Sequence, residues 1–301
     1  MRKLKGVPQH DLLVAGFPCQ PFSSLSLQPG LSDANGRLFE EIVRVLRDSR
    51  PPYFLLENVP GLLKSNSGGD MKAILDALSS LGYQVSYDLV NARHVSAQQR
   101  KRLYVVGMRE GRFEFPCQPE LGLLARDVLD FEAENEMYGI SEAQMEQLRG
   151  ARMSRSLAWP ERKVNTLISH YGISVGRGGS QLVPRWAPSL PRLFTVRECA
   201  RIMGFPNSYH LEVASRREAK EVYRLLGNAV CPAVVTVLAA AIFKRAGGAA
   251  AQALAYQALV EKDTWSRGMT TKASPLTAVR RTMVMIAEAE AGAVSSLKVR
   301  D

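Results

Sequence analysis

Asp11-Leu12-Leu13-Val14-Ala15-Gly16 is a short apolar run that ends at a glycine, the pattern of a buried strand. Apolar residues then recur at helical spacing over Gly36–Asp48, and Pro51-Pro52 ends that predicted helix. Tyr53–Leu56 is a second short apolar run. Strand, helix and strand in this order predict an α/β sheet, in which ligands bind at the carboxyl ends of the strands.

The same alternation continues along the chain. Asp70–Leu81 has apolar residues at helical spacing, and Gly82 fits the position just after a helix end. Tyr83–Val90 and Leu103–Met108 are predicted to be further strands. These segments support the α/β prediction.

Residues 110–191 break the pattern with scattered prolines and an Arg177-Gly178-Gly179-Ser180 run, which predicts a loop-rich insert. Thr195-Val196-Arg197-Glu198 then matches a capping box, so a helix is predicted to start there and to end at Gly204. A last helix is predicted over about Ala233–Lys244. The expected parts are an α/β core over 1–109, an insert over 110–191, the remainder of the core over 192–245 and a C-terminal extension over 246–301, helical or in part disordered.

Positive charge is concentrated in one part of the chain. Lys and Arg number 39 against 29 Asp and Glu, for a net charge of +10. Residues 151–245 carry 15 basic and 5 acidic side chains, whereas residues 110–150 carry 3 and 10. A basic region next to an acidic one suits a surface that binds a polyanion in one orientation. A basic face that only meets solvent explains the charge equally well.

Several classes of protein are disfavoured. We find no apolar run long enough to span a bilayer, and Met1–Gly6 lacks the apolar core of a secretory signal, so we expect an intracellular protein. The four cysteines are far apart and form no CxxC pair, and the four histidines are equally scattered. Neither a metal site nor a disulfide framework is indicated.

Cys19 is the candidate nucleophile. It follows the first predicted strand within Gly16–Ser23 (GFPCQPFS), where Pro18 and Pro21 restrict the backbone and hold the thiol in place. A free thiol has a pKa of about 8.5, so it needs positive surroundings or a helix N-terminus to become a good nucleophile. A cysteine by itself more often has a structural role, but this eight-residue context favours a reactive one.

Five motifs in a fixed order resemble those of the cytosine-C5 DNA methyltransferase family. GFPCQPFS looks like the nucleophile loop of that family. The others are Glu57-Asn58-Val59, Gln98–Arg102 (QQRKR), Arg197–Pro206 (RECARIMGFP) and Gly227-Asn228-Ala229-Val230, which are similar to the family's ENV, QxRxR, RECARLxGFP and GNAV motifs. The resemblance covers about residues 8–245. It implies a Rossmann-like, S-adenosylmethionine-dependent methyltransferase sheet, N-terminally incomplete, with a small irregular target-recognition insert.

The resemblance also implies a mechanism, that of a DNA (cytosine-5-)-methyltransferase. Cys19 adds to C6 of a cytosine, so that C5 can attack the methyl group of S-adenosylmethionine. Glu57 acts at N3, and it must be protonated or share a proton with N3. Arg100 reaches the cytosine and the region of the cysteine, whereas Arg102 braces the site, including Glu57. Gln98, Arg100 and Arg102 alternate along an extended segment, so we expect them on one face. Two alternatives stay open: an ordinary strand-end carboxylate for Glu57, and a basic edge strand for Arg100 and Arg102.

Binding positions follow from the same resemblance. The expected cofactor positions are Pro18, Leu38, Asn228, Ala229 and Val230. The expected substrate positions are Gln20, Ser23, Asn58, Gln98 and Arg177. Ser23–Leu31 resembles the mobile loop that closes over the target base, which such enzymes extrude from the duplex. Further candidate DNA contacts, each of which has a solvated surface role as its alternative, are Arg152, Arg155, Arg162, Lys163, Arg177 and Arg185.

One element of the family is missing before Cys19. The family usually begins with a strand and an FxGxG glycine turn that holds the cofactor, and neither precedes Cys19 here. We expect an uncovered sheet edge and weak binding of S-adenosylmethionine by the isolated chain, which calorimetry tests. Three explanations stay open: an incomplete gene model or fragment, half of a split enzyme whose partner chain supplies the missing strands, and a degenerate homologue that binds DNA without methylating it.

The expected substrate is double-stranded DNA. The tRNA-methylating branch of the family usually has PPCQ where this chain has Gly16-Phe17-Pro18-Cys19-Gln20, so the sequence favours DNA over RNA. Competition between tRNA and duplex DNA tests this choice. The expected location is DNA-associated: the nucleus in a eukaryote, the cytoplasm or nucleoid in a bacterium.

Overall fold

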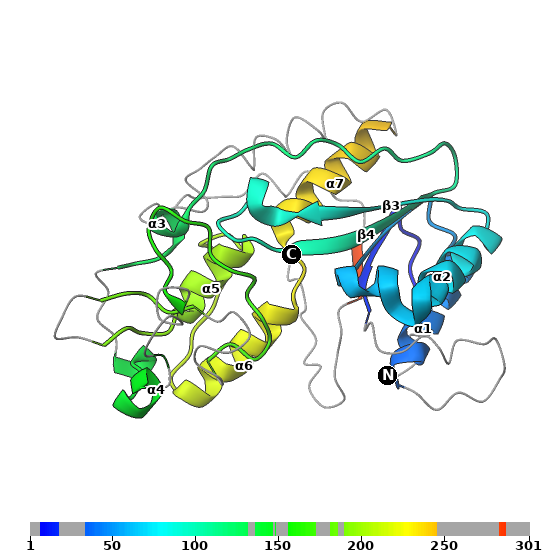
Figure 1. Cartoon of the computed structure of the whole chain (residues 1–301). Helices are drawn as coiled ribbons and strands as arrows, with labels where there is room; N and C mark the ends of the chain where they lie inside the picture. The colour runs from blue at the N-terminus through cyan, green and yellow to red at the C-terminus, as the bar shows by residue number, and fades with distance from the viewer. Residues whose placement is uncertain are drawn as a thin grey trace. The chain divides into compact units, whose positions relative to one another are not determined.

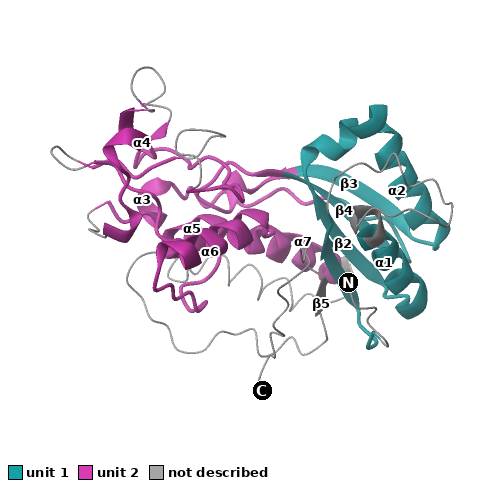
Figure 2. Cartoon of the chain, turned by 90° about the horizontal axis from the view of Figure 1, so that it is seen from below, with its two compact units in different colours: residues 1–89, 102–114, 280–301 teal, residues 90–101, 115–279 magenta. Residues whose placement is uncertain are grey.

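The computed structural model describes residues 7–17, 34–131, 136–146, 148, 156–172, 181–185, 190–245 and 283–286. Contacts along the chain divide it into two compact units (Figure 2). Unit 1 comprises residues 1–89, 102–114 and 280–301, and unit 2 comprises residues 90–101 and 115–279.

A mixed sheet organises unit 1. Its strands lie in the order β3-β4-β2-β1-β5 (Figure 1), and all four strands predicted from the sequence are confirmed. β1 runs parallel to β2, which runs antiparallel to β4. The elements of this part of the chain are β1 Leu12–Gly16, α1 Ala34–Ser49, β2 Tyr53–Asn58, the 3-10 helix η2 Pro60–Gly68, α2 Gly69–Ser80, β3 Gln84–Asn91, β4 Lys101–Met108 and β5 Met283–Ile286.

Helices α1 and α2 cover one face of this sheet (Figure 1). Every second residue of a strand points to the same face, and the alternate residues of β1, β2 and β4 share one core cluster with both helices. Ile42 of α1 and Ile74 of α2 are fully buried in this cluster. Gly82 has a φ of +87° just after α2, as its predicted place beyond the helix end requires. The strand residues of the cluster are Leu13, Ala15, Phe54, Leu56, Leu103 and Val105.

The outer side of β1 is paired in the structure. β5 runs parallel to β1, with Leu12 opposite Met283 and Ala15 opposite Ile286. β5 supplies the hydrogen-bonding partner that the edge of β1 needs, so the sheet ends on this side at β5 and not at β1. The extension over 246–301 was expected to be helical or in part disordered, and residues 283–286 of it instead form this strand.

Helices α5 and α6 and a second core cluster organise unit 2. The apolar faces of α5 and α6 pack together with residues of the predicted insert, such as Val128, Leu167 and Tyr171. For this reason residues 192–245 group with the insert, which differs from the boundaries expected from the sequence. The elements of this unit are the 3-10 helix η3 Ala92–His94, α3 Ala125–Val128, the 3-10 helix η4 Glu136–Tyr138, α4 Glu142–Glu146, α5 Val196–Met203, α6 Arg216–Asn228 and α7 Pro232–Arg245.

Of the three longest helices of unit 2, the sequence predicts α5 and α7. α5 begins at the capping box of Thr195 and Glu198 and ends at Gly204, with a φ of +83°, as predicted. α7 also matches its predicted range closely. The prediction missed α6, although Ser215 caps it by accepting from the Glu218 amide. Its exposed side is rich in charge, which obscures its apolar stripe.

One stretch meets the composition of a membrane span. Arg216–Lys244, taken as one helix, is long and apolar enough to cross a bilayer, with a mean hydropathy of 2.1 over a window that is half buried. From the sequence we predicted no apolar run long enough to span a bilayer. The structure divides the stretch into α6 and α7, and α7 has 14 residues, fewer than the ~20 that a bilayer needs. Leu238 and Ile242 of α7 are fully buried, as in a core helix.

Candidate active site

The carboxyl ends of β1 and β2 lie side by side in unit 1, where Gly16 pairs with Glu57. Asn58, which is 3% exposed, donates a 2.8 Å hydrogen bond from Nδ2 to the carbonyl of Phe17. Its Oδ1 accepts from the amide of Val59, also at 2.8 Å. Both ends of this side-chain amide are therefore engaged, and one of them fixes the backbone two residues before Cys19.

Phe17 is itself held by packing. Its side chain is buried, and its ring centroid lies 5.3 Å from that of Phe39 on α1. The last residue described before the candidate nucleophile is thus anchored twice, by its ring and by its carbonyl. A buried ring and a buried hydrogen bond together restrict the backbone more than either does alone.

Glu57 and Arg102 form an ion pair in the same unit. Glu57 of β2 lies opposite Tyr104 of β4, and Arg102 is two residues before Tyr104, so all three side chains are on one face of the sheet. The Arg102 Nε lies 3.1 Å from the Glu57 Oε1, and the two side chains are 16% and 13% exposed. This ion pair is the contact that the predicted bracing role of Arg102 requires, and the role itself stays a prediction.

The segment before β4 carries two buried polar side chains in unit 2. Gln98 is fully buried; its Nε2 donates to the carbonyl of Ile202 at 2.8 Å, and its Oε1 accepts from the amide of Leu167 at 3.3 Å. Arg100 is 2% exposed and donates to the carbonyls of Leu167 (2.9 Å), Gly227 (3.0 Å) and Ala229 (2.8 Å). Because both side chains grip the peptide groups of Leu167, they lie on one side of the segment, as their alternation predicts.

Several predicted site residues are outside the described part of the chain. The structure gives no placement for Pro18, Cys19, Gln20, Ser23, Arg152, Arg155 and Arg177. The roles assigned to these residues stay predictions, as does closure of Ser23–Leu31 over a base.

The predicted cofactor positions that are described fall in both units. Leu38 is 6% exposed and belongs to the core cluster under α1. Asn228 is exposed, and Ala229 and Val230 are half-buried after α6, in the other unit. The cofactor role assigned to these residues stays a prediction. The described residues contain no group of three metal-ligating side chains.

Lys163, a candidate DNA contact, turns its ammonium toward the protein. Its Nζ donates to the carbonyls of Arg93 at 2.6 Å and Ser96 at 3.1 Å. Burial lowers the pKa of Lys163, and Arg93 adds to this, against the opposing charge of Glu120. The neighbouring Arg162 is exposed, so it is the more accessible of the two cations.

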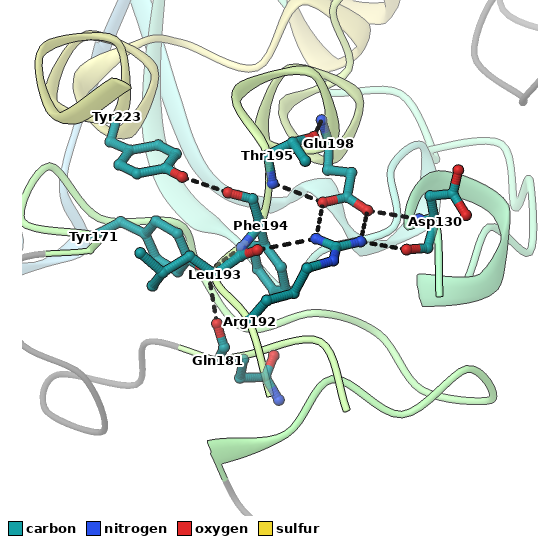
Figure 3. Close-up of polar contacts among 9 residues, drawn as sticks. All are labelled: Asp130, Tyr171, Gln181, Arg192, Leu193, Phe194, Thr195, Glu198 and Tyr223. Atoms are coloured by element: carbon teal, nitrogen blue, oxygen red, sulfur yellow. Dashed lines mark hydrogen bonds and ion pairs between the residues drawn. The ribbon is translucent and has the colours of Figure 1, made fainter. Parts of the chain in front are cut away.

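An extended buried polar network, which sequence reasoning missed, lies in unit 2 (Figure 3). Arg192 and Glu198 are 0% and 1% exposed and form an ion pair at 2.8 Å. The guanidinium also donates to the carbonyls of Leu193 and Asp130. Burial lowers the pKa of Arg192, but the hydrogen bonds and charge of Glu198 outweigh it, so the net shift is upward.

Two tyrosines extend this network. The Tyr171 hydroxyl donates to the carbonyl of Gln181 at 2.8 Å and accepts from the amide of Phe194 at 2.8 Å, and the Tyr223 hydroxyl donates to the carbonyl of Phe194 (Figure 3). Burial raises the pKa of both phenols, so both stay neutral donors at ordinary pH. The capping box around Glu198 is the one signal of this network in the sequence, and Arg192 has none, because a buried arginine has no local pattern.

Comparison with known proteins gives the family. The family described as C-5 cytosine-specific DNA methylase matches residues 2–244. The type II methyltransferase M.MspI of Moraxella sp is 34% identical over 241 residues, which are 77% of this chain and 56% of that enzyme. The type II methyltransferase M.DsaV of Dactylococcopsis salina is 34% identical over 245 residues, 77% of this chain and 68% of that enzyme.

Solved structures agree on the fold. The S. pombe Dnmt2 methyltransferase aligns with a TM-score of 0.60 at 23% identity, over 76% of each chain. The Entamoeba histolytica methyltransferase EhMeth aligns with a TM-score of 0.59 at 20% identity, over 78% of this chain and 77% of that one. The chain belongs to the C-5 cytosine-specific DNA methylase family. It spans little more than half of the Moraxella enzyme.

Proposed function

We propose that this chain is a DNA (cytosine-5-)-methyltransferase, whose site activates C5 of a flipped-out cytosine in double-stranded DNA. The observation that carries the proposal is the arrangement at the end of β2. There the Glu57–Arg102 ion pair adjoins Asn58, which anchors Phe17. The candidate nucleophile Cys19 follows Phe17 by two residues in the sequence, which supports a common site for Cys19 and Glu57.

In the proposed first step, Cys19 Sγ forms a bond to C6 of the cytosine. The C5=C6 π bond breaks, a C4=C5 double bond forms, and the electron pair of the C4=N3 bond moves to N3, which takes up a proton. We propose that Glu57 shares with N3 the proton that this nitrogen takes up.

The later steps restore the aromatic ring. Family membership implies S-adenosylmethionine as the methyl donor, which supplies an electrophilic methyl group to C5. A base then removes the C5 proton, and the Cys19 thiolate leaves from C6. The cofactor positions stay predictions, as does weak binding of S-adenosylmethionine by the isolated chain, which calorimetry tests.

Covalent trapping tests the first step. A duplex pool in which 5-azacytosine replaces cytosine on one strand needs neither a known recognition sequence nor a methyl donor, because the ring nitrogen at position 5 makes C6 more electrophilic. We expect a covalent DNA–protein adduct that is absent with Cys19→Ala. A second pool with 5-fluorocytosine and added S-adenosylmethionine tests methyl transfer, because fluorine cannot leave as a proton does. Adducts that persist in Cys19→Ala, or DNA binding without any adduct, contradict the proposal.

Competition decides the nucleic acid. The relatives named as type II methyltransferases and the family description support DNA. Unlabelled duplex DNA is therefore expected to suppress the adduct at lower concentration than tRNA. Stronger suppression by tRNA would instead support an RNA cytosine-C5 methyltransferase. A DNA-associated location within the cell follows from the proposal, and neither the family nor the relatives support a second chain that completes the sheet.

A further inference from the structure

The QxRxR segment is a hub for three separate backbone segments of unit 2. Ala97 and Gln99 pair with Val164 through main-chain hydrogen bonds of 2.7 and 2.8 Å. The side chain of Gln98, which lies between these two residues, accepts a hydrogen bond from the amide of Leu167. The side chain of Arg100, the next residue after Gln99, donates to the carbonyl of Leu167. The segment 164–167 is thus held alternately by main chain and side chain.

The other ends of the same two side chains reach helix C-termini. The last four carbonyls of an α-helix have no partner within the helix and carry partial negative charge. Gln98 donates to Ile202 in the last turn of α5, and Arg100 donates to Gly227 in the last turn of α6 and to Ala229 just beyond it. A guanidinium is well suited to this place, since its planar fork presents several donors at once.

The end of α6 also packs closely against the peptide between Ile168 and Ser169, independently of Arg100. A Cβ built on Gly227 would lie 2.3 Å from the carbonyl carbon of Ile168 and the amide nitrogen of Ser169. The end of α6 therefore lies directly on the peptide that follows Leu167. Ser169 is half-buried and His170 is exposed, so this peptide leads from the buried hub to the surface.

We propose that Arg100 is a positioning residue that holds Leu167, Gly227 and Ala229, and that it does not touch the reacting cytosine. Through Leu167 it sets the segment 167–170 within the predicted target-recognition insert of residues 110–191, and through Ala229 it sets the turn between α6 and α7. The DNA part of this inference rests on the proposed function. It assigns to Arg100 a role other than the catalytic one that its motif implies.

Two measurements on the full chain test the inference in Arg100→Lys and Arg100→Met. The first is amide hydrogen exchange, which is expected to become faster in 164–172 and 226–231 and to stay unchanged in β1 and β2. The second is the rate of adduct formation with the 5-azacytosine duplex at increasing DNA concentration. We expect the half-saturating concentration to rise about tenfold, as the loss of hydrogen bonds from a charged group implies, with little change in the rate at saturation. Arg217→Met, on the exposed side of α6, is the control.

The outcomes separate the possible roles. A residue that touches cytosine would lower the rate at saturating DNA and leave exchange unchanged, and this result would overturn the inference. Loss of folded protein alone would lower only the amplitude. If both Arg100 variants fail to fold, Gln98→Met replaces them, because it releases the Leu167 amide. It is expected to speed amide exchange and to raise the half-saturating DNA concentration. No change in either quantity would count against the inference. If the unaltered chain forms no adduct, the proposed function fails while the exchange measurement still tests the hub.

Discussion

Glu57 and Asn58 are adjacent in the chain and act on different partners. Successive side chains of a strand point to opposite faces, so Glu57 meets Arg102 across the sheet while Asn58 reaches back to Phe17. In the proposed function Glu57 acts on the base, and Asn58 holds the carbonyl of Phe17, two residues before the proposed nucleophile. The proposal therefore gives a chemical role to Glu57 and a positioning role to Asn58.

Replacing Glu57 tests the chemical role. Glu57→Gln keeps the shape of the side chain but cannot share a proton with N3, so adduct formation at saturating DNA is expected to slow by about 10²- to 10⁴-fold. The measurement is the rate of trapping on the 5-azacytosine duplex. Glu110→Gln, an exposed carboxylate in the same unit, is the control. An unchanged rate in Glu57→Gln would remove Glu57 from the proposed chemistry.

Tyr83 gives unit 1 a dependence on alkaline pH. Its buried hydroxyl donates to the carbonyl of Pro51 at 2.7 Å, and burial raises its pKa to about 12 against the opposing charges of Arg109 and Arg50. An unfolded tyrosine titrates near ~10. The folded chain therefore binds the proton more tightly, and stability present below pH ~10 is lost as the pH rises toward 12.

Urea unfolding at pH 9 and 11.5 measures this effect. Tyr83→Phe is expected to be less stable than the unaltered chain at pH 9, because the hydrogen bond to Pro51 is gone. Its unfolding free energy is expected to fall less between the two pH values, by roughly 1–3 kcal/mol. Equal pH dependence in both proteins would show that Tyr83 does not carry the effect.

Among the elements, the start of α5 depends on the Arg192–Glu198 pair. Removing one partner leaves a buried charge without compensation, so Arg192→Met is expected to lower the free energy of unfolding by about 3–5 kcal/mol. Adding Glu198→Gln removes the remaining charge, so the double variant is expected to be more stable than Arg192→Met alone. Chemical denaturation of the single and double variants measures both effects. A double variant less stable than the single one contradicts this account.

The contact between α6 and the segment 168–169 has no room for a methyl group. Gly227→Ala forces the backbone groups apart, and overpacking of this kind costs at least about 1–3 kcal/mol of unfolding free energy. Gly61→Ala is the control, because its Cβ would meet only a Val59 methyl at 4.0 Å. Denaturant unfolding compares the two, and equal stability would disprove the close contact.

The elements also show how far the sequence alone leads. Elements with a local signature in the sequence were all predicted. The signatures are an apolar period, capping residues and turn glycines, and the elements are β1, β2, β3, β4, α1, α2 and the capped start of α5. α6 was missed because charged residues fill its exposed side. Arg192, Gln98 and Arg100 could not be placed, since nothing local distinguishes a buried polar side chain from an exposed one. Their partners lie up to 129 residues away in the sequence.

The charge of the whole molecule sets how it would bind DNA. With a net charge of +10, contacts to about six phosphates would cost ~10³-fold in affinity between 50 and 200 mM salt. Arg162→Ala is expected to reduce the slope of log affinity against log salt by about one. Lys163→Met is the matched comparison, and its slope is expected to stay unchanged because its ammonium faces the carbonyls of Arg93 and Ser96. Fluorescence anisotropy over a salt series measures the slopes, and equal slopes for the two variants would contradict this assignment.

Arg100 also has a consequence for synthesis of the chain. Its last carbonyl partner, Ala229, is made 129 residues after it. At the usual pace of 5–20 residues per second, a ribosome takes roughly 6–26 s to produce that partner. During this interval the guanidinium cannot enter its final place and remains hydrated, so unit 2 cannot close around it on the nascent chain. Completion of this part of the protein is therefore a late event, because α6 itself ends at Asn228, one residue before Ala229.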